Sequence, residues 1–313
     1  MMVNGTAQWV RLCGRDRRAP VLLWIQGGPG LPGIAERKSL QRRLRLEDDF
    51  VVAYWDQRGA GKSFSRSLAP ESMTYDQLVE DARMVADALR KRFPKQPLLV
   101  TGFSIGGTIA LLTGWRYPDA ADAVIANGPD IAWGSAEHTA YDFAVHEAVS
   151  RKNGRAQREL RKLGRPPHTT PAAFRAKAKW IANFGGMHRA WTMRSLQREI
   201  LGQLLRAPEY SPSDIARSIA GMQFSLTHLL NEVGNRDLAR DIAQLGAPFW
   251  LLQGRYDRVA PAAIAEVFFE GLAAPAGKHV VWFEKSAHMP HYEEPEKFRS
   301  TLLHIAAHAV RCS

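Results

Sequence analysis

A serine at position 104 occupies the centre of the pattern Gly102-Phe103-Ser104-Ile105-Gly106. The apolar run 97–100 precedes this pattern, and a stretch of helical character begins at Ile105. At such a strand-to-helix junction the chain turns sharply and lifts the serine hydroxyl clear of the sheet, while the glycines let the backbone pass. The pattern therefore predicts that Ser104 is a nucleophile.

A serine hydroxyl is a weak nucleophile at neutral pH and needs an adjacent base, which in turn needs an acid to orient it. Asp257 follows the predicted strand 249–253 after a short turn, and His288 lies on the loop after the predicted strand 280–283. Both side chains then stand at the carboxyl ends of strands. The order Ser104, Asp257, His288 is one that a catalytic triad takes along a chain. These residues are predicted to form a triad.

Two further residues could enter this site. Asp130, which follows the predicted strand 123–126, could supply the acid from a neighbouring strand end, although Asp257 fits better. His291 lies three residues beyond His288 and is expected at the rim. Taken singly, Asp257 could cap a turn and His288 could be a surface residue, but that interpretation does not account for both behind this serine.

The negative charge that develops on a substrate carbonyl oxygen needs N–H donors that are already in place. One donor is expected to be the backbone N–H of Ile105, next to the nucleophile. The second is expected from the loop 26–30, Gln-Gly-Gly-Pro-Gly, whose glycines allow close approach to a substrate. Gly28 is the preferred donor and Gly27 the second choice. A simple glycine turn is the alternative.

Short apolar runs alternate with helical patterns before residue 132 and again after residue 248. This alternation is typical of an α/β fold with a mostly parallel central sheet flanked by helices. The predicted strands are 8–12, 21–25, 50–54, 97–101, 123–126, 248–253 and 279–283. The predicted helices are 74–92, 105–117, 261–272 and 296–309.

Between residues 133 and 241 the pattern changes to one helix after another. We interpret this all-helical block as a cap inserted over the carboxyl ends of the strands, where ligands bind in open parallel sheets. A catalytic core of residues 1–132 and 242–313 and a cap of residues 133–241 are therefore expected. Aromatic side chains beside the nucleophile and in the cap are expected to form an apolar substrate pocket: Phe103, Trp133, Trp180, Phe184, Trp191 and Phe224.

The segment 56–63 ends in Gly-Lys-Ser, as phosphate-binding loops do. That motif needs a glycine five residues before Gly61, and Asp56 stands there. We expect a structural loop held by Asp56 and Arg58 near the site entrance. Cys13 and Cys312 lie near opposite ends without metal-like spacing. No nucleotide, other cofactor or metal is predicted.

The chain is strongly basic, with 42 Lys and Arg against 31 Asp and Glu and a formal net charge of +11. Aromatic residues are not interleaved with the basic clusters as base stacking requires, so nucleic acid is not an expected partner. No apolar run approaches the ~20 residues of a membrane helix. The N-terminus lacks a basic region followed by an apolar core, and two free thiols fit a reducing compartment. A cytoplasmic protein with a small-molecule or short-peptide substrate is expected, with no membrane partner.

Together these motifs resemble those of the α/β-hydrolase superfamily and, within it, the proline iminopeptidases. The resemblance rests on Gln-Gly-Gly-Pro-Gly at 26–30, Trp-Asp-Gln-Arg-Gly-Ala-Gly-Lys-Ser at 55–63, Gly-Phe-Ser-Ile-Gly-Gly at 102–107, Gly-Arg-Tyr-Asp at 254–257 and Ser-Ala-His-Met-Pro at 286–290. It implies an eight-stranded sheet, an all-helical cap and no cofactor. It also implies removal of an N-terminal residue, usually proline, from small peptides or arylamides. Gln26 stands where the family usually has histidine.

The cap glutamates that hold the substrate amine in such peptidases have no evident counterpart motif, and the candidates are Glu147, Glu199, Glu209 and Glu232. Two enzyme functions follow. One is an aminopeptidase of proline iminopeptidase type, and the other is an esterase, amidase or lactonase acting on a hydrophobic metabolite. A third hypothesis is a non-catalytic ligand-binding protein on the same fold.

Overall fold

The computed structural model of the chain describes residues 1–234 and 236–312. Cys13 is a half-buried free cysteine, whereas the side chain of Cys312 lies outside what the structure describes. Among the described helices, none combines the length and the apolar composition that crossing a membrane requires.

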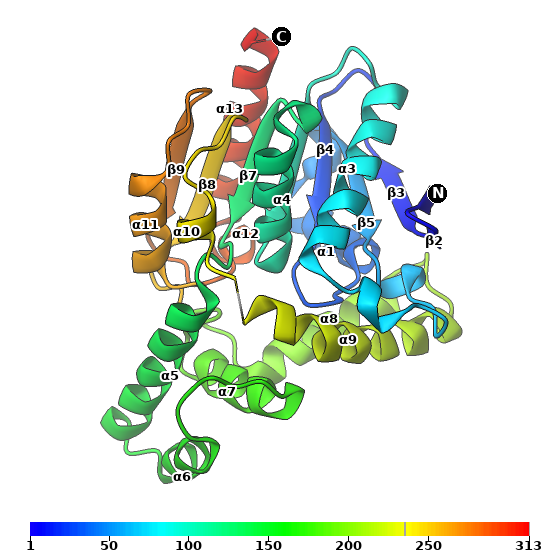
Figure 1. Cartoon of the computed structure of the whole chain (residues 1–313). Coiled ribbons are helices and arrows are strands. Elements are labelled where there is room, and N and C mark those ends of the chain that lie inside the picture. The colour runs from blue at the N-terminus through cyan, green and yellow to red at the C-terminus, as the bar shows by residue number, and fades with distance from the viewer. Residues whose placement is uncertain (235, 313) are drawn as a thin grey trace.

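A seven-stranded sheet forms the centre of the molecule (Figure 1). All neighbouring strands are parallel except the edge pair β3 and β5, so the six parallel strands end at one edge of the sheet. The strand order is β3 (Trp9–Cys13), β5 (Val51–Asp56), β4 (Val21–Ile25), β6 (Leu98–Phe103), β7 (Ala123–Asn127), β8 (Phe249–Gly254) and β9 (Lys278–Phe283). The predicted fold class is confirmed.

The sheet has one strand fewer, within the described residues, than the eight that the family resemblance implied. The N-terminal strands β1 (Met2–Val3) and β2 (Thr6–Ala7) pair with each other and do not extend the sheet beyond β3. Asn4 and Gly5 both have positive φ angles, which suits the tight turn of such a hairpin. This corrects the implied strand count.

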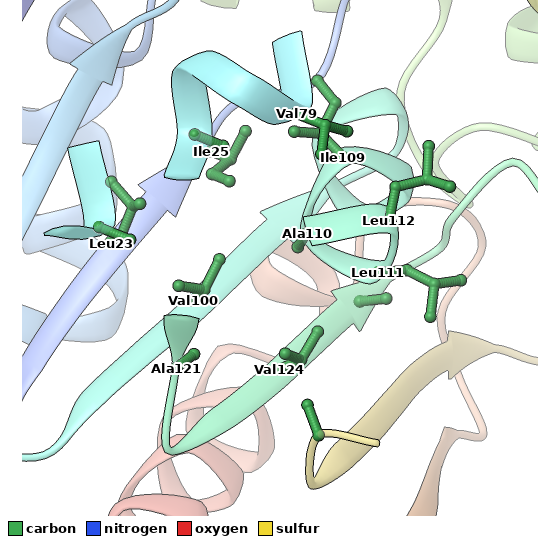
Figure 2. Close-up of a cluster of buried hydrophobic side chains, with 14 of the residues drawn as sticks. Leu23, Ile25, Val79, Val100, Ile109, Ala110, Leu111, Leu112, Ala121 and Val124 are labelled. Atoms are coloured by element: carbon green, nitrogen blue, oxygen red, sulfur yellow. The ribbon is translucent and has the colours of Figure 1, made fainter. Parts of the chain in front are cut away.

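Helices cover both faces of the sheet. The helices α3 (Tyr75–Arg92), α4 (Ile105–Arg116) and α11 (Ala262–Gly271) pack on one face, and α1 (Gly33–Leu44) and α13 (Pro295–Cys312) pack on the other. Because side chains alternate along a strand, every residue of β4 is buried on one face or the other. Figure 2 shows one of these layers, in which Ile25 of β4 and Val100 of β6 lie beneath α3 and α4.

A helical insertion separates β7 from β8 and lies beyond one end of the sheet (Figure 1). Its first three helices have a small hydrophobic core of their own, which includes Tyr141, Leu160 and Trp180. The helices are α5 (Trp133–Ser150), α6 (Gly154–Leu163), α7 (Pro171–Asn183), α8 (Met193–Arg206), α9 (Pro212–Val233) and α10 (Leu238–Asp241). Two single-turn helices, α2 (Leu46–Asp49) and α12 (Pro290–Glu293), complete the remaining connections.

The loop after β5, which ends in Gly-Lys-Ser, is held by buried polar contacts. The Asp56 carboxylate accepts hydrogen bonds from the backbone N–H groups of Ile34, at 3.0 Å, and Lys62, at 2.9 Å. The Arg58 guanidinium donates two hydrogen bonds to the Asp81 carboxylate, at 2.7 and 3.0 Å. Both members of this ion pair are almost fully buried. These are the contacts of a structural loop.

The same loop binds the longest helix of the insertion, α9. Lys62 Nζ donates to Asp214 Oδ2 at 2.9 Å, and Ser225 Oγ donates to the Gly59 carbonyl at 2.9 Å. A Cβ atom added to Gly221 would lie 2.6 Å from that carbonyl oxygen. The two backbones therefore touch without an intervening side chain.

Candidate active site

Ser104 lies on a sharp turn between β6 and α4. Its φ of 54° and ψ of −126° fall outside the regions that L-residues ordinarily occupy, and its N–H donates to the Asn127 carbonyl at 2.8 Å. A methyl group at Gly102 would collide with the Gly106 carbonyl, and one at Gly106 would collide with the Ile25 carbonyl. Glycine at both positions thus permits the turn that presents the hydroxyl.

Asp257 and His288 form a buried pair at the ends of β8 and β9. His288 Nδ1 lies 2.7 Å from Asp257 Oδ2, and since a carboxylate can only accept, Nδ1 carries the proton and Nε2 is free to accept one. The other oxygen, Asp257 Oδ1, accepts from the backbone N–H groups of Val259, at 2.8 Å, and Ala260, at 2.9 Å. The carboxylate is therefore fixed in position by the turn that carries it.

The protonation of His288 is set by two opposing effects. Burial alone would lower its pKa, but the charge of Asp257, the hydrogen bond to it and the charges of Asp130 and Glu293 together outweigh burial, so the pKa of His288 lies above its usual 6.5. Phe103 packs on the ring with a centroid distance of 4.9 Å. A Cβ atom at Gly128, where φ is +55°, would lie 3.1 Å from His288 Nδ1. Gly128 therefore leaves room for the pair.

Ser104 and His288 line the same cavity. Among the described residues the Ser104 hydroxyl has no hydrogen-bond partner, and Ser104 is 7% exposed. Catalytic hydrogen bonds are often long or open in ligand-free sites and tighten when a substrate binds. The geometry brings a strained serine and a buried histidine–carboxylate pair to one place.

The loop 26–30 passes directly beside the serine. A Cβ atom added to Gly27 would lie 3.2 Å from Ser104 Cβ. The Gly27 N–H already donates to the Gln26 side-chain oxygen at 2.7 Å. Gln26 in turn donates to the buried Glu36 carboxylate, which also accepts from Trp24 Nε1 at 3.1 Å. This chain of contacts favours the first choice, Gly28, over Gly27 as an oxyanion donor.

Ile105 is the first residue of α4, so its N–H is one of the groups that have no acceptor within the helix. The positive end of the helix dipole lies at the same place. Ile105 and Gly28 both line a small cavity together with Ser104. Both preferred donors therefore lie next to the nucleophile.

Two cavities meet at Ser104. The outer cavity has a volume of about 920 Å³ and is bounded largely by α7 and α8 of the insertion. The inner chamber is much smaller, about 50 Å³, and is lined by parts of α4, α5 and α7. Ser104, Gly28, Phe174, Ala178, Met187 and Val259 line both.

Four of the six predicted pocket residues line these cavities. Phe103, Trp180 and Trp191 line the outer cavity, and Trp133 lines the inner chamber. Phe184 and Phe224 do not line either cavity, because each packs into a separate hydrophobic cluster. Phe184 stacks on Trp180 in the core of the insertion, and Phe224 packs against Phe64.

His291 is not at the rim, where the sequence suggested it would lie. It is fully buried between Trp24 and Phe103, and its Nδ1 lies 3.1 Å from the Asn127 amide nitrogen. Burial holds the pKa of His291 well below its usual value, so the ring is neutral. The helical turn α12 turns His291 inward, which its sequence spacing from His288 does not reveal.

Two buried acids line the cavities beside the serine, and the sequence indicated only one of them, Asp130. Glu36 lies on helix α1, which was not predicted, and burial raises its pKa to about 7. Asp130 lies in the inner chamber, and burial raises its pKa to about 6. A carboxylate directly after a strand end was the only sequence signal for Asp130, and Glu36 had none.

Of the four candidate acids in the insertion, Glu199 lines the outer cavity. Its carboxylate accepts from Ser39 Oγ at 2.7 Å. Glu147 pairs with Arg151 and Glu209 with Arg37. None of Glu147, Glu209 and Glu232 lines the outer cavity or the inner chamber. Within the described residues, no three His, Cys, Asp or Glu side chains are grouped so that they could hold a metal ion.

Comparison with known proteins gives a consistent result. The family model described as serine aminopeptidase, S33, matches residues 40–181. The probable aminopeptidase YbaC of Bacillus subtilis (strain 168) is 30% identical over 309 residues, covering 98% of this chain and 95% of its own. A proline iminopeptidase of Heyndrickxia coagulans is 25% identical over 292 residues, covering 90% of this chain and 88% of its own.

The fold is shared with a solved structure. The proline iminopeptidase of Mycobacterium smegmatis superposes with a TM-score of 0.69 at 17% identity, covering 99% of this chain and 98% of its own. This likeness shows the fold, and the B. subtilis relative, which aligns almost from end to end, shows the family. The chain belongs to the α/β-hydrolase superfamily and is a proline iminopeptidase-like member of its S33 serine aminopeptidase family.

Proposed function

We propose that the protein is a serine hydrolase in which Ser104 is the nucleophile, His288 the general base and Asp257 the residue that orients His288. The observation that carries this proposal is the Asp257–His288 pair, 2.7 Å apart, opening on the cavity where Ser104 sits on its strained turn. Catalysis by acyl transfer needs these three roles in this arrangement.

The reaction then proceeds in two halves. Ser104 Oγ attacks the carbonyl carbon of an amide or ester while its proton passes to His288 Nε2. The bond to the leaving group breaks as His288 returns that proton to the departing nitrogen or oxygen. Water attacks the acyl-enzyme in the same way, which releases the acid and restores Ser104. Asp257 stabilises the imidazolium formed in each half and keeps the Nδ1 proton in place.

The oxyanion is held in this proposal by the N–H groups of Gly28 and Ile105. Both residues line the inner chamber beside Ser104, and the Gly27 N–H is already engaged by Gln26. Loss of one such donor reduces kcat by about 10²–10³-fold in enzymes of this kind. The helical insertion would act as the cap that selects the substrate.

For the substrate, we propose release of an N-terminal residue from small peptides or amides. The aminopeptidase name of the relative with end-to-end similarity supports this class. A second candidate, hydrolysis of a hydrophobic ester, amide or lactone, is supported by the large outer cavity, whose wall includes Phe103, Trp180, Trp191 and Leu196.

A fluorophosphonate probe tests the serine mechanism, and a panel of substrates tests the substrate class. We expect the probe to modify Ser104 in the wild-type protein, as mapped by peptide mass spectrometry, and the Ser104→Ala variant to lose both labelling and turnover while its circular dichroism is retained. Labelling at another residue, or full activity of Ser104→Ala, would refute the serine mechanism. Arylamides with free and blocked amines, compared with short acyl esters, then separate the two substrate classes.

A further inference from the structure

The inner chamber contains a carboxylate that has no hydrogen-bond partner among the described residues. Asp130, on the loop between β7 and α5, is 7% exposed, and the structure gives its side chain no hydrogen bond or salt bridge within the described residues. Its backbone is fixed to α4, because its N–H donates to Thr108 Oγ1 at 2.9 Å and its carbonyl accepts from that hydroxyl at 3.1 Å. The carboxylate is thus held in the chamber wall without a donor.

An unpaired buried carboxylate is unfavourable, and buried polar groups are almost always hydrogen-bonded. Lys177 also lines the chamber, but its ammonium group donates to another carboxylate. Lys177 Nζ donates to Glu137 Oε1 at 2.5 Å, and it lies 5.5 Å from the ring centroid of Trp133 and 5.9 Å from that of Phe174. Asp130 therefore keeps an open acceptor on the surface of the chamber.

The charges of the chamber do not balance. Three of its described lining residues carry ionisable groups, namely Asp130, Glu137 and Lys177. Glu137 and Lys177 compensate each other. His288 and Asp257 also act electrostatically on Asp130, and while His288 is neutral the charge of Asp130 remains in excess. A cation that enters the chamber would restore neutrality, whereas an anion would meet two carboxylates and one ammonium group. The chamber therefore favours a positively charged occupant.

We propose that Asp130 binds the ammonium group of a small α-amino acyl substrate, whose carbonyl is attacked by Ser104. This inference rests on the proposed serine mechanism and adds to it the residue that recognises the free amine. In an α-amino acyl group the amine is one carbon from the scissile carbonyl, and Ser104 and Asp130 line the same chamber. The leaving group then extends into the outer cavity.

The size of the chamber limits the acyl group. A volume of about 50 Å³ admits an ammonium group with a short side chain, while the 920 Å³ outer cavity admits a leaving group many times larger. Acetylation of the substrate amine would remove the positive charge and add three heavy atoms where space is least. Both the lost charge and the added volume should lower the activity on substrates with a blocked amine.

The test uses two arylamides that differ by one charged group, alanine 4-nitroanilide and propionic acid 4-nitroanilide. We expect the wild-type protein to prefer the first by at least about 100-fold in kcat/KM, since a charged donor meets a buried acceptor. In Asp130→Asn we expect this preference to fall by about 10- to 100-fold. Asp119→Asn, the same change at an exposed position, is the matched control and should keep the wild-type ratio.

Two further measurements, the labelling of Ser104 by the probe and its protection by small amides, separate a loss of amine recognition from a loss of folding. The rate of fluorophosphonate labelling of Ser104 in Asp130→Asn shows whether the variant is folded and active as a nucleophile. In the wild type, alaninamide should protect Ser104 from the probe at far lower concentration than propionamide. Equal protection by the two amides, or an unaltered substrate ratio in Asp130→Asn, would overturn the role of Asp130. Absence of labelling at Ser104 in the wild type would instead overturn the serine mechanism itself.

Discussion

The carboxyl edge of the sheet and the helical insertion contribute to the site in different ways. At the edge, backbone geometry places the reacting groups: the strained φ of Ser104, and the two N–H groups that fix Asp257. In the insertion, side chains on regular helices form the walls, among them Trp180, Trp191 and Lys177. In the proposed mechanism the chemistry thus depends on turns, which recurrent motifs encode, and the choice of substrate depends on helix surfaces, for which the sequence carries no such motif.

The largest expected effect comes from the edge. Asp257→Asn keeps the shape of the side chain but allows the wrong imidazole tautomer, so we expect kcat to fall by about 10³–10⁴-fold for every substrate. Steady-state kinetics on an uncharged ester measures this loss. If Asp257→Asn keeps its activity while Asp130→Asn loses that much, the orienting acid is Asp130 and the assignment here is wrong.

Two glycine substitutions compare the regions by stability. Gly106→Ala places a methyl group against the Ile25 carbonyl, a rigid backbone contact, so we expect a loss of about 1–3 kcal/mol in the free energy of unfolding. In Gly134→Ala, in the first turn of α5, the added Cβ has no atom within 4 Å, and we expect a gain of about 0.5–1 kcal/mol. Denaturant titration reports both. If the two substitutions changed the free energy of unfolding equally, the edge of the sheet would not be more rigid than the insertion.

The pH dependence of the reaction is a further test of the edge. Only neutral His288 can accept the Ser104 proton, so kcat/KM should fall about tenfold per pH unit below the pKa of His288. Because that pKa is raised above 6.5, the midpoint for an uncharged ester should lie above 6.5. Burial raises the pKa of Glu36 to about 7, and Glu36→Gln separates its titration from that of His288. A midpoint below 6.5 would contradict the charge effect of Asp257.

The smallest expected effect belongs to the insertion. Trp191 stacks on His188 in the wall of the outer cavity, with ring centroids 4.2 Å apart. In Trp191→Ala we expect KM for substrates with large apolar leaving groups to rise about three- to tenfold with little change in kcat, since uniform binding is lost. Trp9→Ala, at an exposed residue of the edge strand β3, is the control. A large fall in kcat would show that the insertion also positions the reacting groups.

Much of the core could be predicted because its signals are local. Ser104, Asp257 and His288 each lie within five residues of the end of a strand, and parallel strands bring such positions to one edge whatever the intervening chain does. The seven strands of the main sheet and four of its helices were also predicted, with each end within three residues of the observed one.

What escaped prediction depends on tertiary packing. The helix α1 has many basic residues and a weak apolar periodicity, yet Ile34, Leu40 and Leu44 are buried against the sheet. Asp130 has no hydrogen-bond partner because Lys177 donates to Glu137 instead. These three residues lie on three separate segments of the chain. Such pairings leave no pattern along the chain, because they are fixed only when the helices pack.

The contact between Gly221 and Gly59 has a consequence for how the molecule unfolds. Two backbones that touch directly, with Lys62 and Asp214 paired beside them, cannot separate without breaking both an ion pair and a close-packed surface. The helix α9 therefore belongs to the same cooperative unit as the sheet, and heat or denaturant should unfold the two together. The longest helix of the insertion is therefore, in its stability, a part of the core that contains the sheet.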